Sequence, residues 1–182
     1  LLPALAKAKA AGTSIACLNN NRQLLIAWHN FSADNDEHII YASAWYYPSF
    51  DGKYPSGLKY EPTVDFSWCA SEYLGANMPP KDWLEKSVLY PYAGRSRDVF
   101  HCPEDKNFGL AKQKGWPARV RSYSINIYAG GWSGWPFVGD QMWKIYRQQS
   151  DFRDPANRFV LMDMNDKSIN AGNYRVHMAG WP

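Results

Sequence analysis

Residues 2–11 have the sequence LPALAKAKAA, in which nearly every residue is a strong helix former. Further along, Leu18, Leu25 and Trp28 lie at positions i, i+7 and i+10, which places all three side chains on one face of a helix. The polar segment SADNDE at residues 32–37 interrupts this spacing. The sequence therefore predicts a single N-terminal helix over residues 1–32.

The predicted helix is longer than its surroundings require. About thirty helical residues span ~45 Å, which exceeds what a compact domain of 182 residues needs. The chain is 46% hydrophobic and 20% charged, a composition that argues against wholesale disorder. Its net charge of +3 is too small to indicate a nucleic-acid partner, and no apolar run reaches the ~18 residues of a membrane span.

The rest of the chain, residues 33–182, is predicted to form a globular head. Tyrosine-rich runs broken by Pro and Gly indicate a loop insertion at about 39–80. Strand-like patterns follow, of which 120–128 alternates and 158–163 is continuously apolar, as in a central strand. We expect an α+β fold, a long helix packed on an antiparallel sheet with aromatic-rich loops. The expected strands cover 99–102, 120–128, 158–163 and 173–178.

The three cysteines are Cys17 in the helix, Cys69 in the loops and Cys102 after a predicted strand. The absence of a CxxC motif, and of a histidine at ligand spacing, argues against a zinc site. We favour a Cys17–Cys102 disulfide that would join helix to sheet in an exported protein. The alternative is three buried free thiols in a reducing compartment.

No pattern in the sequence indicates catalysis. The four histidines are scattered, and neither a G-x-S-x-G turn nor another nucleophile signature is present. We therefore predict no catalytic residues and a protein that is not an enzyme.

An acidic stretch after the last apolar run is the candidate metal site. Asp163, Asn165, Asp166 and Asn170 offer hard oxygen ligands of the kind that Ca²⁺ prefers. The spacing and closing glutamate of an EF-hand are absent. The alternative interpretation is an ordinary Asx-turn loop.

The chain is rich in aromatic residues, with nine Trp and twelve Tyr. Such rings supply a large contact area at low entropic cost, so they suit a polysaccharide or protein partner. The alternative is that they pack loops that lack regular structure. The candidate contact residues are Trp45, Tyr46, Tyr47, Trp132 and Trp135.

Several stretches together resemble a known family. They are LLPALAKAKA at 1–10, CLNN at 17–20, LYPY at 89–92, FHCPED at 100–105, VRSYSIN at 120–126, DPANRFVLMD at 154–163 and DKSIN at 166–170. The pattern is similar to the prepilin-type N-terminal cleavage/methylation family, which includes type II secretion pseudopilins and type IV pilin-like proteins. The resemblance covers the helix and the C-terminal half.

The resemblance implies a pilin-like fold and a non-enzymatic filament subunit in the bacterial cell envelope. Ahead of Leu1 we would expect a basic leader, a prepilin peptidase site and an apolar segment that anchors the precursor in the inner membrane. The implied partners are copies of the chain, other pilin-like subunits and the inner-membrane assembly machinery. Calcium binding by major pseudopilins of this family adds weight to the acidic site. The residues expected to pack the helix are Leu5, Leu18, Leu25 and Trp28. The alternative function is a carbohydrate-binding module that uses the aromatic loops.

Overall fold

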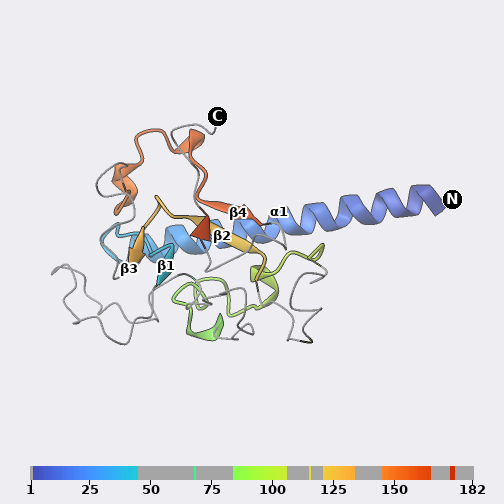
Figure 1. Ribbon diagram of the computed structural model, residues 1–182, viewed down its shortest axis with the longest axis horizontal. Coiled ribbons are helices and arrows are strands. Elements are labelled where there is room, and N and C mark those ends of the chain that lie inside the picture. Colours follow the sequence, from blue (N-terminus) through green and yellow to red (C-terminus); the bar gives the residue numbers. More distant parts are fainter. Residues whose placement is uncertain are drawn as a thin grey trace.

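The fold consists of one long helix and a set of short strands and turns gathered around its C-terminal half (Figure 1). The computed structural model describes residues 2–44, 68, 84–105, 115, 121–133, 145–164 and 173–174. Most of the predicted loop insertion at 39–80 lies outside these residues.

Helix α1 is a single element of 33 residues, Leu2–Asp34, and it confirms the predicted N-terminal helix. It ends because Asp36 and Glu37 adopt left-handed backbone conformations, with φ of 52° and 64°. The amide of Glu37 then donates to the Ser32 carbonyl, which closes the last turn. The N-terminal half of α1 extends away from the other described segments (Figure 1).

The strands form two small sheets. β1 (Ser43–Ala44) pairs in parallel with β3 (Trp132–Ser133). In the larger sheet, β2 (Tyr123–Asn126) is central, with β4 (Leu161–Asp163) antiparallel on one side and β5 (Asn173–Tyr174) parallel on the other. The α+β class is therefore confirmed, but the expectation of a purely antiparallel sheet is wrong at β5.

Four short 3-10 helices connect these elements. They are η2 (Leu84–Lys86), η3 (Asp98–Phe100), η4 (Gln149–Asp151) and η5 (Pro155–Asn157). The core lies where the C-terminal half of α1 meets η3 and the larger sheet. Leu24 and Trp28 of α1 belong there to the same buried cluster as Phe100, Ile125 and Leu161.

Two strand predictions are wrong. Residues 99–102 do not form a strand, because the His101 amide donates to the Asp98 carbonyl and closes a 3-10 turn there. The apolar run 158–163 forms a strand only at its end, in β4, which is an edge strand of the sheet. Its Phe159 is 71% exposed, so the run is not the buried central strand that its composition indicated.

Predicted strand 120–128 is confirmed only over its middle, Tyr123–Asn126. Its alternation of apolar and polar residues does not correspond to an inner and an outer face. Ser122 and Ser124 are as fully buried as Tyr123 and Ile125. Ser122 Oγ has hydrogen-bond partners in this buried position, whereas Ser124 Oγ has none among the described residues.

Candidate functional site

The N-terminal half of α1 is the most exposed part of the fold. Every described residue from Leu2 to Gly12 is exposed, although the segment contains large apolar side chains. Leu5 and Leu18 are each 69% exposed, and Ile15 is 60% exposed. Within the described residues, no helix is both long and apolar enough to cross a membrane. This half of the helix therefore presents apolar surface that none of the described segments covers.

The exposed surface has a regular pattern. Five apolar residues recur at i, i+4, i+7, i+11 and i+14, so they share one face of the helix, whereas Leu2 and Leu5 lie off it. No acidic side chain occurs in α1 before Asp34, and the same half of the helix carries Lys7 and Lys9. The stripe is therefore narrow, smooth and set in a basic segment. Its members are Ala4, Ala8, Ala11, Ile15 and Leu18.

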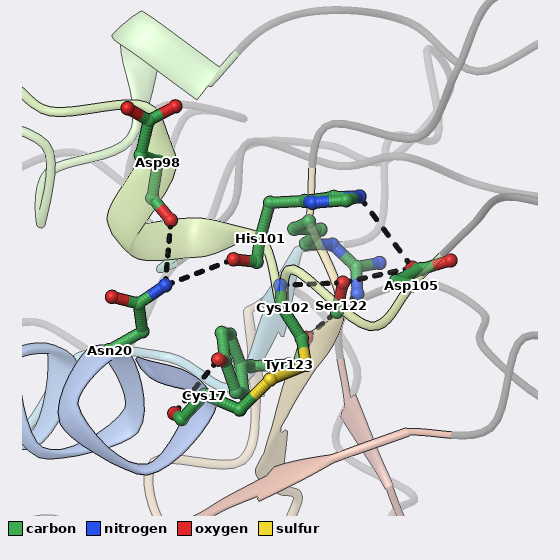
Figure 2. A network of polar contacts seen from close by, with 9 residues as sticks. Cys17, Asn20, Asp98, His101, Cys102, Asp105, Ser122 and Tyr123 are labelled. Carbon is green, nitrogen blue, oxygen red and sulfur yellow. Dashed lines mark hydrogen bonds and ion pairs between the residues drawn. A yellow bond between two sulfur atoms is a disulfide. The ribbon is translucent and has the colours of Figure 1, made fainter. Parts of the chain in front are cut away.

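A disulfide marks the point where α1 becomes attached to the head. Cys17 of α1 is bonded to Cys102, with the two Cα atoms 4.9 Å apart and a separation of 85 positions in sequence (Figure 2). This confirms the favoured pairing over three free thiols. Cys69 lies outside the described residues.

Hydrogen bonds close to the disulfide complete the attachment (Figure 2). The Asn20 amide donates to the carbonyls of Asp98 and His101, at 2.9 and 3.0 Å. The Tyr123 hydroxyl donates to the Cys17 carbonyl at 3.0 Å. Burial, and then the negative charge of Asp163, raise the pKa of the Tyr123 phenol, so it stays a donor well into alkaline solution. α1 is thus fixed to η3 and β2 within one helical turn.

A second set of polar contacts stabilises the turn that follows Cys102. Ser122 Oγ donates to the Asp105 carboxylate at 2.8 Å and accepts from the Cys102 amide at 3.0 Å. His101 Nε2 lies 3.8 Å from the same carboxylate. In a nucleophilic triad the histidine lies between serine and acid, whereas here the buried serine contacts the acid directly. The arrangement therefore fits support of the 101–105 turn rather than nucleophilic catalysis.

The residues predicted to pack the helix divide into two groups. Trp28 is buried, and Leu25 is partly buried against the core. Leu5 and Leu18 are each 69% exposed, so the head does not bury them, and their part in helix packing stays a prediction. The head covers only the part of α1 that follows the disulfide.

The proposed calcium ligands are mostly outside the described residues. Asp163 ends β4, with an exposed side chain, whereas Asn165, Asp166 and Asn170 are not described. Partial burial raises the pKa of Asp163, and the charge of Asp105 adds to this, whereas a backbone hydrogen bond from Met164 and the charge of His101 oppose it. No cluster of three or more His, Cys, Asp or Glu suited to a metal occurs in the described ranges. Calcium binding stays a prediction.

The aromatic contact residues are also largely undescribed. Trp45, Tyr46, Tyr47 and Trp135 fall outside the structure's described ranges, and Trp132 is placed only as backbone, in register with Ser43. Contact with a polysaccharide or protein through these rings stays a prediction.

Sequence reasoning missed the polar attachment of α1. Asn20, Asp105, Ser122 and Tyr123 come from separate segments, and each has an ordinary sequence context. One signal was available at Asn20, because Asn is unfavourable in a helix interior unless its amide has another partner.

Searches of protein-family models, of curated proteins and of solved structures find no match to this chain.

Proposed function

We propose that the chain is a non-enzymatic, pilin-like structural subunit of an extracytoplasmic filament or of a type II secretion system. In this proposal, the N-terminal half of α1 packs among the helices of other copies, and the head is displayed outside that bundle. The observation that carries it is the contrast within one helix. α1 leaves its apolar stripe exposed before Cys17 and is fixed to the head from Cys17 onward.

Physical chemistry favours a partner for the exposed half. Isolated helices of about 15 residues are marginal in water, and most gain stability by burying an apolar face. Exposed apolar surface of this kind is a usual mark of an interaction site. The alanines of the stripe would let two helices approach closely, which is how helices pack where large side chains are few.

The basic character of α1 and its disulfide fit a cell-envelope location. Lys7 and Lys9 would favour the anionic surface of an inner membrane. A disulfide that closes a long loop persists in oxidising compartments such as the periplasm. The apolar anchor upstream belongs to the proposal through the sequence resemblance alone.

Site-specific cross-linking tests this function. The full precursor gene, carrying Cys69→Ser, is expressed in a bacterium that assembles such filaments, and intact cells are treated with a short thiol-reactive bismaleimide. Ile15→Cys places a thiol on the stripe, whereas Ser150→Cys places one on an exposed part of the head. We expect membrane-associated dimers and higher multimers from Ile15→Cys, and few from Ser150→Cys.

Two results would count against the proposal. One is a precursor that remains full-length in the cytosolic fraction. The other is equal cross-linking from both positions, because nonspecific collision would then account for the multimers.

A further inference from the structure

A groove of about 600 Å³ lies beside the attached half of α1. One wall is α1 itself, and the other is the segment 152–161, which contains η5 and the start of β4. Trp28 and Leu161 are the buried members of its lining, and Leu25 and Phe152 are partly buried. Leu18 and Phe159, both about 70% exposed, are its two open apolar members. The groove is therefore an apolar channel with access from solvent.

The charge of the groove has one sign. Arg22 contributes from α1 and Arg158 from the residue after η5, while no Asp or Glu belongs to the described part of the lining. Neither guanidinium makes a hydrogen bond or ion pair in the part of the chain that the structure describes. His29 is already engaged, because its Nδ1 lies 3.0 Å from Gln149 Oε1. Two cations thus lie along apolar surface without a carboxylate to neutralise them.

This charge disfavours α1 of a second copy as the occupant. The exposed half of α1 carries Lys7 and Lys9 and no acidic residue, so it would bring like charges to Arg22 and Arg158. A carboxylate-bearing partner would instead be attracted to both guanidinium groups, which form strong paired contacts with carboxylates.

The spacing of the apolar side chains favours a helical occupant. Leu18 and Leu25 lie two turns apart, about 10.5 Å along the α1 axis. An amphipathic helix presents its anchors at i, i+3, i+4 and i+7, and therefore over the same length.

We propose that this groove binds an amphipathic helix of a different protein, whose apolar face enters the channel while acidic residues on its flanks pair with Arg22 and Arg158. This partner goes beyond the filament function, since it would use α1 from Leu18 onward and leave the exposed residues before Cys17 free for other copies.

The test uses two synthetic helical peptides that differ only in charge. Both carry fluorescein and leucines at i, i+3, i+4 and i+7; one has glutamate on both flanks and the other has lysine. Their binding to the 182-residue chain is followed by fluorescence anisotropy at low and high salt. We expect the glutamate peptide to bind about tenfold more tightly, and this preference to shrink as salt screens the pairs.

Charge reversal locates the binding. R22E/R158E should weaken binding of the glutamate peptide about tenfold and favour the lysine peptide instead. R153E is the matched control, because Arg153 is exposed in the same region but does not line the groove. It should change neither affinity. Circular dichroism confirms that each variant is folded.

Other outcomes would overturn the proposal. Absence of binding, or equal binding of both peptides, would show that the groove does not select acidic helices. Sedimentation of the chain with anionic vesicles, lost in R22E/R158E while no peptide binds, would assign the groove to a lipid surface. Self-association that Phe159→Ser abolishes, again without peptide binding, would assign it to a second copy.

Discussion

The two halves of α1 are continuous in one helix but lie in different surroundings. Before Cys17, apolar side chains such as Leu5 and Ile15 are exposed, and nothing in the described residues covers them. After Cys17, Leu24 and Trp28 are buried in the core, and Asn20 bonds to the turn at η3. Helical structure is therefore common to both halves, whereas tertiary attachment belongs to the second alone.

This difference shows that helix formation and packing have separate causes in α1. Local propensity favours a helix along its whole length, because alanine, leucine and lysine dominate its start. Packing begins only where the disulfide and the polar contacts bring the head against it. Stability should consequently respond to changes in the second half and hardly at all to changes in the first.

Removal of the disulfide should have the largest effect. Cys17→Ser combined with Cys102→Ser opens a loop of 85 residues, and the chain-entropy relation gives a loss of about 4.5 kcal/mol in the free energy of unfolding. Denaturant unfolding followed by tryptophan fluorescence measures it. Cys69→Ser alone should leave the free energy nearly unchanged. A loss as large from Cys69→Ser would place the essential cross-link elsewhere.

The same substitution on a buried and on an exposed face of α1 should give very different results. Leu24 is fully buried and Leu18 is 69% exposed, although both are leucines of one helix. Leu24→Ala should cost about 3 kcal/mol through lost burial and a residual cavity, whereas Leu18→Ala should change stability by less than ~0.5 kcal/mol. Urea unfolding of both variants checks this. Similar losses from the two would mean that Leu18 also packs within the head.

Tyr123→Phe removes one bond between sheet and helix, so its effect should be smaller. Loss of the hydrogen bond to the Cys17 carbonyl should cost about 1 kcal/mol at neutral pH. The folded pKa of this phenol is raised, so its contribution is complete below pH ~10, the unfolded pKa, and falls as pH rises above that value.

Measurements of the free energy of unfolding between neutral pH and pH 12 test whether stability falls, as predicted, when the pH rises. The parent chain should lose stability above pH ~10, and Tyr123→Phe should lose less over the same range. Tyr174 is the remaining contributor, since burial raises its pKa to about 12. Identical alkaline profiles of parent and Tyr123→Phe would show that this phenol is not protected in the fold.

Gly12→Ala should have the smallest effect on global stability. Gly12 has open space around it and lies in the exposed half, so alanine fits without contact. The change should raise local helix stability by up to ~1 kcal/mol and increase helicity by circular dichroism. The midpoint of global unfolding should stay where it is. A rise of the midpoint would show that the first half unfolds together with the head.

The sequence predicted α1 correctly, because a run of helix formers is a strong local signal. The Cys17–Cys102 bond was the favoured of two alternatives, and it forms although the strand expected at 99–102 does not. The sequence also located the middle of β2. Residues 99–102 were misassigned, since hydrogen bonds of the turn at Asp98 outweigh the β-propensity of Val99 and Phe100.

The groove and the polar attachment could not be predicted from sequence. Arg22 and Arg158 are 136 residues apart (158 − 22), and only folding places them in one channel. Phe159 was interpreted as part of a buried central strand, but β4 begins two residues later and lies at the edge of the sheet. Propensity indicates where a helix forms, whereas partners distant in sequence determine which of its faces are covered.

Hydrogen exchange along α1 tests the central claim most directly. Amides of residues 6–15 would be followed in the isolated 182-residue chain and in filaments assembled from the precursor. The account predicts fast exchange in the isolated chain, slow exchange after Cys17, and at least about tenfold greater protection of residues 6–15 in the filament. Strong protection of residues 6–15 already in the isolated chain, or none in the assembled form, would contradict it.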